Sequence, residues 1–211
     1  MRLRHHVNPL KGGYGLSPVS PVPLPAIGPV EVELGCADAR FLFERARAEP
    51  RLTCIGVDIR EETVREVNLR AQAEGLPGLF AVFANVTTDL PGLFPDGRLD
   101  RIYLNFPDPW FKRRQRKRRV LTPEVAATLS RQLAPDGEVF FQSDVYDLAL
   151  EAMAALEAHG GFENAAGPWS FLPQNPYGAR SLREVRCEEK GAKVWRLRYR
   201  SASQRSGSET S

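Results

Sequence analysis

Apolar and polar positions along the middle of the chain follow two periods, which predict strands that alternate with helices. Short apolar runs typical of buried strands span residues 30–34, 53–57, 79–83, 101–106 and 138–142. Apolar residues at helical spacing span residues 39–48, 61–73, 123–133 and 145–158. This alternation is typical of a mostly parallel central sheet that helices flank. We therefore expect an α/β, Rossmann-like fold that binds its ligands at the carboxyl ends of the strands.

The two ends of the chain have a different composition from its middle. Residues 1–28 are rich in proline and glycine, and residues 201–211 are small and polar. Neither segment has enough apolar surface to offset the entropy of ordering. We expect a flexible N-terminal tail over 1–28, a single domain over 29–200 and a disordered C-terminal tail over 201–211.

Length and composition narrow the class of protein. The 211 residues are 42% hydrophobic and 26% charged, as in an ordinary globular domain. No apolar stretch reaches the roughly 18 residues of a membrane span, and the N-terminus lacks the apolar region of a signal peptide. We expect a cytoplasmic protein without membrane contact.

Cysteine and histidine are scarce. Cys36, Cys54 and Cys187 are widely spaced and odd in number, a pattern that favours reduced thiols over disulfides or a zinc site. The three histidines form no ligand pair at helical spacing. The sequence therefore predicts no metal site and offers little material for a histidine-centred catalytic triad.

Positive charge is concentrated in one segment. The chain carries a net charge of +3, yet Lys112 to Arg119 reads KRRQRKRR, so the rest of the chain is mildly acidic. Such a cluster is typical of a phosphate-binding surface. Taken alone, it is also compatible with a localisation signal or with a merely solvated face.

Polar residues follow four of the predicted strands. They are Glu33 with Gly35, then Asp58, then Asn85, then the segment 105–108. Asp58 lies 23 residues after Gly35, close to the roughly 20-residue offset at which an acid reaches ribose hydroxyls. This spacing favours a cofactor that contains a nucleoside. An acid that only interacts with the dipole of the following helix would occupy the same position as Asp58.

The turn after the first strand carries one glycine, Gly35, followed by Cys36, Ala37, Asp38 and Ala39. A dinucleotide fingerprint has three glycines, so this turn disfavours pyrophosphate. S-adenosylmethionine contains ribose and adenine without phosphate, and an acid such as Glu33 suits its ammonium group. The spacing alone does not choose between cofactors.

The segment that leaves the fourth predicted strand is Leu104-Asn105-Phe106-Pro107-Asp108-Pro109-Trp110. The two prolines fix the backbone on either side of Asp108 and remove two donors, which predicts a carboxylate that a rigid loop holds in place. The alternative is a turn-forming Asp beside a tryptophan that fills the core. The basic cluster directly downstream favours the functional interpretation.

Together these residues resemble the bacterial tRNA (guanine-nitrogen-7)-methyltransferases. The resemblance rests on NFPDPWFK followed by RRQRKRR, on VELG and IGVD upstream, and on SDVY downstream, and it spans about residues 29–200. It implies a class I S-adenosylmethionine-dependent methyltransferase that modifies a guanosine of the tRNA variable loop, position 46 in the family. It also implies a monomer or a weak homodimer.

The resemblance assigns roles to single residues of this chain. It implies that Gly35, Glu33, Asp58, Asn85 and Asp108 contact S-adenosylmethionine, with Asp108 also catalytic. It places the RNA substrate at Lys112, Arg114, Arg116, Lys117, Arg118, Arg119 and Asp144, and the target nucleotide at Ser181 and Glu184. The sequence departs from the family at Ala37 and Ala39, where glycines stand, at Asn85, where an Asp stands, and at Arg183, where an aromatic residue stands.

These residues support a mechanism without a general base, because nitrogen-7 of guanine already carries a free lone pair. We expect Asp108 to compensate the positive charge that develops on the guanine and Glu184 to accept hydrogen bonds from it. Two alternatives stay open. One is a methyltransferase that acts on another nucleic-acid position, and the other is a non-enzymatic RNA-binding protein with a degenerate cofactor site.

Overall fold

The computed structural model describes residues 20–112, 114–115 and 119–202. Its strands are β1 (Val30–Leu34), β2 (Thr53–Asp58), β3 (Leu79–Phe83), β4 (Leu99–Asn105), β5 (Leu133–Ser143), β6 (Phe162–Asn164) and β7 (Trp195–Ser201). Its helices are α1 (Arg40–Ala48), α2 (Glu61–Ala73), α3 (Val86–Leu93), α4 (Pro123–Gln132), α5 (Tyr146–His159) and α6 (Leu182–Glu189). The strands form one sheet in the order β3-β2-β1-β4-β5-β7-β6, in which β7 alone runs antiparallel to both of its neighbours.

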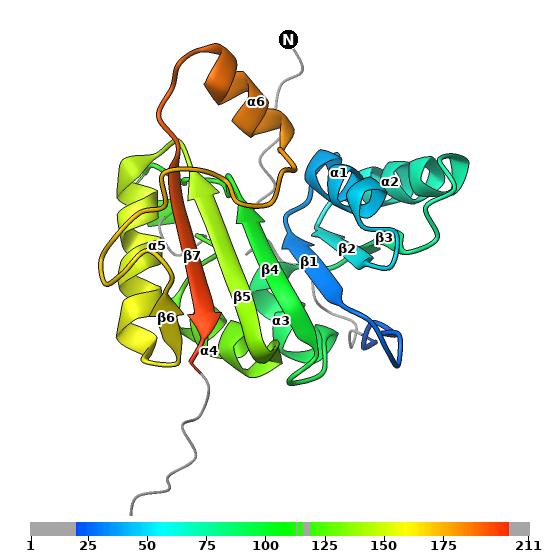
Figure 1. Ribbon diagram of the computed structural model, residues 1–211, viewed down its shortest axis with the longest axis horizontal. Coiled ribbons are helices and arrows are strands. Elements are labelled where there is room, and N and C mark those ends of the chain that lie inside the picture. The colour runs from blue at the N-terminus through cyan, green and yellow to red at the C-terminus, as the bar shows by residue number, and fades with distance from the viewer. Residues whose placement is uncertain (1–19, 113, 116–118, 203–211) are drawn as a thin grey trace, which may run out of the picture.

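Helices cover the sheet in two layers (Figure 1). On one face α3, α4 and α5 bury Leu93, Leu129 and Met153 in a continuous apolar core. On the other face α1 and α2 bury Phe41 and Val64 in a second core. Because both faces are packed, the parallel strands are fixed in register, and the loops at their carboxyl ends are left to form a site.

The strand order reverses at β1, which lies between β2 and β4. The chain leaves β1 toward β2 and returns to β4 on the other side, so the loops after β1 and β4 diverge above the sheet. α6 lies above the strand ends on the same side (Figure 1). This point is where an open α/β sheet binds its ligands.

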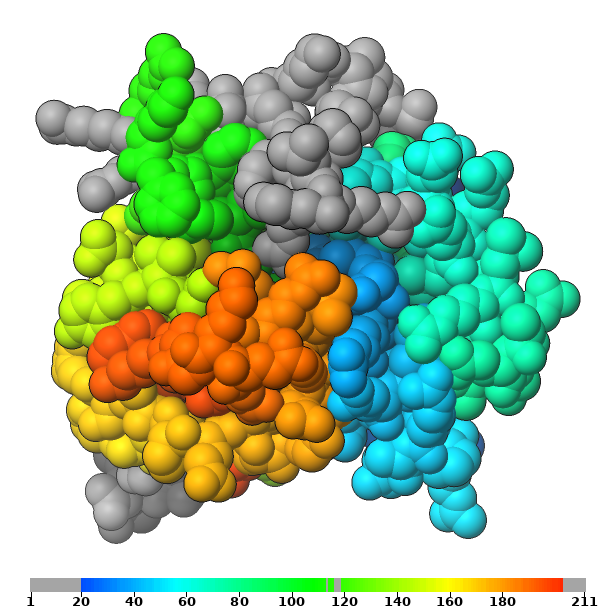
Figure 2. Space-filling view, turned by 90° about the horizontal axis from the view of Figure 1, so that it is seen from above, coloured from blue at the N-terminus to red at the C-terminus, as the bar shows by residue number. Residues whose placement is uncertain are grey.

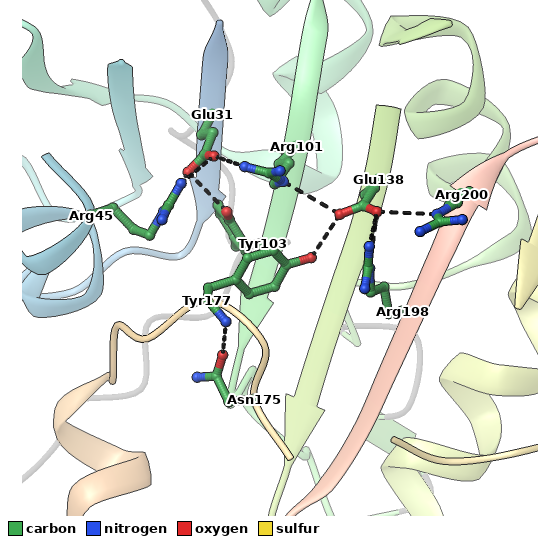
Figure 3. Close-up of polar contacts among 9 residues, drawn as sticks. All are labelled: Glu31, Arg45, Arg101, Tyr103, Glu138, Asn175, Tyr177, Arg198 and Arg200. Atoms are coloured by element: carbon green, nitrogen blue, oxygen red, sulfur yellow. Dashed lines mark hydrogen bonds and ion pairs between the residues drawn. The ribbon is translucent and has the colours of Figure 1, made fainter. Parts of the chain in front are cut away.

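A polar network crosses the face of the sheet below the strand ends (Figure 3). The register pairs Glu31 with Arg101, Arg101 with Glu138 and Glu138 with Arg200, so charges alternate in sign across four strands. Glu31 is fully buried and pairs with Arg101 and with Arg45 of α1. The network ties α1 to the strands that carry the loops above, because the buried Glu31 pairs with Arg45 of α1 and with Arg101 of β4 at the same time.

Replacement of Tyr103 by phenylalanine tests this network. The buried Tyr103 hydroxyl donates to Glu31 Oε2 at 2.8 Å, and a phenylalanine keeps the ring contacts while removing that bond. We expect Tyr103→Phe to lower the free energy of unfolding by about 2 kcal/mol in urea titrations. Tyr177→Phe is the matched control, since the half-buried Tyr177 donates to Glu138 over 3.1 Å and Glu138 keeps its arginines. An equal loss of unfolding free energy in both variants would contradict the idea that the bond to the buried Glu31 carboxylate stabilises the fold more than the bond to Glu138.

The predicted α/β architecture is confirmed, with differences at the ends of the chain and in its elements. α3, β6, α6 and β7 were not predicted, and β5 is longer than predicted because it continues through Asp136, whose φ is 61°. Part of the predicted N-terminal tail packs on the domain: Val22 is 6% exposed and donates its N–H to the Leu93 carbonyl. Residues 1–19 and 203–211 of the predicted tails lie outside the described residues.

Two properties of the described residues bear on the class of protein. No helix among them has the length and apolar character that crossing a membrane requires. Cys36, Cys54 and Cys187 are buried free thiols, and burial raises the pKa of each. Buried thiols of raised pKa are poor nucleophiles, so these cysteines pack rather than react.

Candidate active site

The loop after β1 folds back over the end of β2. The N–H groups of Gly35 and Cys36 both donate to the Val57 carbonyl, at 2.7 and 3.0 Å. A Cβ on Gly56 would lie 2.6 Å from Cys36 Sγ, so only glycine lets the loop lie this close to the strand. The left-handed backbone at Gly35, Ala37 and Ala39, with φ of 80°, 51° and 50°, completes the turn into α1. Two of these three positions carry a side chain that disfavours that conformation.

The strain at Ala37 gives a prediction about stability. Ala37 is half-buried, and its left-handed φ costs about 1 kcal/mol relative to glycine. We expect Ala37→Gly to raise the free energy of unfolding by about 0.5 kcal/mol. Ala154→Gly, at an exposed position of α5, is the control and should lower it by about 1 kcal/mol. Thermal or urea unfolding measures both variants. Equal losses of unfolding free energy would show that the loop at Ala37 carries no backbone strain.

Glu33, the residue before the last of β1, lies next to this loop and is 3% exposed. Its Oε1 accepts a hydrogen bond from Asn105 Nδ2 at 2.8 Å, whereas its buried Oε2 has no partner in the described part of the chain. Burial, with a smaller contribution from the charges of Asp38 and Asp58, raises the pKa of Glu33 to about 8, although the hydrogen bond from Asn105 lowers it. A buried acceptor that lacks a donor fits a ligand that brings a donor or a positive charge.

Asp58 ends β2 and is held by its neighbours. Its Oδ2 accepts from the Ala37 N–H at 3.0 Å, and Arg60 donates to both of its oxygens at 2.8–2.9 Å. The Asp58 hydrogen bond raises the pKa of Arg60, and the nearby charge of Asp108 contributes to the same shift. The predicted contact of Asp58 with a ribose therefore requires the half-exposed Arg60 side chain to move aside.

Asn85 follows β3 and begins α3. Its Oδ1 accepts from the Thr87 N–H at 3.0 Å, which makes it the N-cap of the helix, and its own N–H donates to Asp89 Oδ2 at 2.8 Å. A capping asparagine at 3% exposure positions the start of α3 at the carboxyl edge of the sheet. The structure therefore places Asn85 beside the predicted cofactor site, in a structural role of its own.

The loop after β4 holds Asp108 in a constrained backbone. Phe106 and Trp110, two residues before and after Asp108, have φ of 51° and 45°, which is uncommon for aromatic residues. Asp108 is half-buried, and its negative charge lies close enough to Arg60 to raise the pKa of the Arg60 guanidinium. Strained backbone of this kind persists where the surrounding structure holds it, and it concentrates at functional sites.

The basic segment divides into parts with different environments. Lys112 and Arg114 are exposed, as a phosphate contact requires. Arg119 is 7% exposed, donates to the Pro109 carbonyl at 2.8 Å and pairs with Glu151 of α5. In this structure the Arg119 guanidinium anchors the Asp108 loop, so a contact with RNA would require it to leave these two partners, and the predicted contact stays a prediction. Arg116, Lys117 and Arg118 lie outside the described residues.

The residues predicted to contact the target nucleotide lie around α6. Ser181 caps the helix by accepting from the Glu184 N–H at 3.2 Å, and Asp144 pairs with Arg183. Glu184 is fully buried and accepts from Gln142, Asn175 and Arg196 at 2.9–3.1 Å. Its two oxygens are thus already engaged, so a guanine reaches them only by displacing one of these donors.

Three site residues were not predicted: Gln142, Asn175 and Arg196. Gln142 Nε2 donates to Glu184 Oε2 and to Asn105 Oδ1, both at 2.9 Å, so a hydrogen-bonded chain runs from Glu184 to Glu33. Gln142 Oε1 and Arg196 Nε are buried without partners among the described residues. Asn175, Glu184 and Arg196 also line a cavity of about 460 Å³ beside α6. The strand predicted over residues 138–142 includes Gln142, whereas Arg196 lies on the unpredicted β7, and no local pattern reveals that both meet Glu184.

Comparisons with known proteins match this arrangement. Residues 28–197 match a family model described as "Putative methyltransferase". A tRNA (guanine-N(7)-)-methyltransferase of Synechococcus elongatus is 36% identical over 94% of this chain and 96% of its own length. One of Trichormus variabilis is 35% identical over 94% and 95%. Among solved structures, the 16S rRNA methyltransferase KamB aligns with a TM-score of 0.61 at 16% identity, over 82% of this chain and 88% of its own.

The sheet order, the loop over β2 and the polar strand ends define a methyltransferase of Rossmann-like fold. The likeness to KamB supports the fold alone, since few residues are shared. The identity with the cyanobacterial proteins extends over nearly the full length of both chains. The chain belongs to the family of tRNA (guanine-N(7)-)-methyltransferases.

Proposed function

We propose that this protein transfers a methyl group from S-adenosylmethionine to nitrogen-7 of a guanosine in the variable loop of tRNA. The observation that carries the proposal is the buried, unpartnered Glu33 Oε2 beside the strained Asp108 loop. S-adenosylmethionine, when bound, supplies a methyl group on a positively charged sulfur. Glu33 suits the ammonium group of that cofactor, and the loop over β2, which carries Ala37 and Ala39 in place of fingerprint glycines, suits a cofactor without phosphate.

The side chains of this site have two tasks. Nitrogen-7 attacks with its own lone pair, so no residue needs to remove a proton first. The site must align the guanine with the methyl group and compensate the positive charge that moves onto the ring. Asp108, which the loop holds rigidly, fits the second task. Glu184 would contact the guanine directly after displacing Asn175 or Gln142, and otherwise acts by fixing Arg196.

The proposal is tested by identifying the methylated nucleoside. The purified protein is incubated with unmodified tRNA and methyl-labelled S-adenosylmethionine, and the RNA is digested and separated. We expect the label in 7-methylguanosine. Label in another nucleoside would retain the enzyme class and replace the substrate chemistry. Tight tRNA binding without label or cofactor binding would favour the RNA-binding alternative.

The exposed part of the basic segment predicts the salt dependence of tRNA binding. If about four cations of the segment meet phosphates, the logarithm of the association constant should fall with the logarithm of salt concentration at a slope of about −3. Replacing Lys112 and Arg114 by glutamine should make the slope shallower by one to two units, on the order of one per phosphate contact. Filter binding over a salt series measures it. An unchanged slope in the variant would remove these two exposed residues from the interface.

A further inference from the structure

Three aromatic rings and a lysine gather at the carboxyl edge of the sheet, outside the site described above. The ring centroids of Tyr146 and Trp195 are 4.5 Å apart, and those of Phe171 and Trp195 are 5.0 Å apart. Lys193 Nζ lies 3.9 Å from the centroid of the Trp195 ring. We call these four residues the aromatic cluster.

The position of the aromatic cluster follows from the register of the sheet. Trp195 begins β7 and pairs with Ser143, the last residue of β5. Tyr146 begins α5, two residues after Asp144, and the Leu172 bridge to Arg196 brings Phe171 alongside. Seen from above the strand ends, the segments around residues 145, 171 and 195 adjoin on one side of α6 (Figure 2). The cluster is therefore continuous with the surface that carries Asp144.

The aromatic cluster differs from a group of core residues because some of its side chains are exposed and one of them is charged. Tyr146 is 46% exposed although its ring has neighbours, and Lys193 is exposed. Phe111 is 73% exposed beside the exposed Lys112 on the Asp108 loop, which rises from the same edge. Exposed rings next to cations are the combination that binds unpaired bases, because the ring stacks on the base while the cation meets the phosphate.

We propose that the aromatic cluster stacks an unpaired base of the tRNA near the methylated guanosine, with Tyr146 as the stacking face and Lys193 at a neighbouring phosphate. The proposal rests on the proposed function and adds a contact that positions the variable loop over the site. A role in packing alone would be met by any apolar side chain at position 146. A stacking role requires an aromatic ring, and this difference makes the two separable.

The test compares Tyr146→Leu with Tyr146→Phe and Lys193→Gln. The dissociation constant for unmodified tRNA is measured by filter binding, the affinity for S-adenosylhomocysteine by calorimetry, and stability by thermal unfolding. We expect Tyr146→Leu to raise the dissociation constant for tRNA about tenfold and Lys193→Gln about threefold, with stability and cofactor affinity unchanged. Tyr146→Phe should restore binding to within about twofold, since it keeps the ring. Leu69→Ala, at a 61% exposed position of α2, is the control.

Each outcome separates this proposal from the proposed function. If the wild-type protein methylates tRNA and Tyr146→Leu binds it equally well, the stacking contact is absent and the proposed function stands. If Tyr146→Leu weakens binding and the wild-type protein leaves tRNA unmethylated, the contact stands and the proposed function is wrong. A loss that Tyr146→Phe shares with Tyr146→Leu would assign the effect to the hydroxyl and overturn stacking.

Discussion

Asp108→Asn is expected to lower the rate of methyl transfer about 100- to 1000-fold, which corresponds to about 3–4 kcal/mol of lost transition-state stabilisation. Asparagine keeps the size of the side chain and one acceptor oxygen, so we expect the Pro107-Asp108-Pro109 backbone to be retained while the negative charge is removed. In the proposed mechanism that charge faces a guanine ring that becomes positive only during the reaction, so we expect its loss to affect the rate more than tRNA binding. Single-turnover methylation at saturating cofactor and tRNA measures the effect.

A matched acid elsewhere on the surface provides the control for this experiment. Asp96 is exposed and lies 3.7 Å from Arg131, away from the strand ends. Asp96→Asn should therefore leave the rate unchanged to within about twofold. Undiminished transfer by Asp108→Asn would exclude the carboxylate charge from the mechanism. A rate loss matched by a collapse of tRNA affinity would instead assign Asp108 to binding.

The parts of the fold that could be predicted are those in which local pattern and tertiary packing agree. The helix over residues 61–73 is predicted and observed with the same bounds because Val64, Val67 and Ala71 form one buried stripe. β1 is buried along its whole length, as a central parallel strand is, although its charged residues Glu31 and Glu33 interrupt the apolar run. Arg45 and Tyr103 satisfy the buried Glu31, whereas Glu33 receives one hydrogen bond, from Asn105, and no local pattern reveals either environment.

The elements that were missed have identifiable causes. α3 contains Pro91 and two threonines, which disfavour a helix locally, and it forms because Leu90 and Leu93 are buried against the sheet. β7 alternates apolar residues with arginines from Trp195 to Arg200, a period-two signal that was present in the sequence. Its antiparallel position between β5 and β6 depends on long-range pairing, and only the structure shows it.

The sequence predicted where the candidate site residues lie better than it predicted the contacts that each of them makes. The strand-end rule correctly places Glu33, Asp58, Asn85 and the Asp108 loop at one edge of the sheet. The resemblance assigns Arg119 to RNA together with its basic neighbours, because a shared basic segment does not distinguish an arginine that faces solvent from one that anchors a loop. Pairings such as Asp58 with Arg60 likewise depend on side-chain directions that spacing alone leaves undetermined.

Glu33→Gln is expected to weaken binding of S-adenosylmethionine by about 100-fold or more, because a charge pair inside a buried site is replaced by a neutral contact. Glutamine fits the same space, so Asn105 keeps a hydrogen-bond partner, and the effect isolates the charge at the unpartnered oxygen. Calorimetry with the cofactor product, S-adenosylhomocysteine, measures the same ammonium contact without turnover. Asp96→Asn, at the exposed acid far from the carboxyl ends of the strands, is the control and should change affinity less than about threefold.

The pH dependence of binding gives the same prediction a second readout. Because burial raises the pKa of Glu33 to about 8, the free protein holds a proton there at neutral pH, and binding of a cation must release it. Affinity should rise by up to about tenfold per pH unit between pH 6 and 7.5 and stay flat in Glu33→Gln. The stability of the free protein should change with pH in the opposite direction. Between pH 4.5 and 8 the folded state binds a proton at Glu33 that the unfolded state has lost, so the free energy of unfolding falls as the pH rises through that window. A pH-independent affinity in the wild-type protein would mean that binding releases no proton from Glu33, which would contradict a neutral Glu33 that ionises to meet the cofactor's charge.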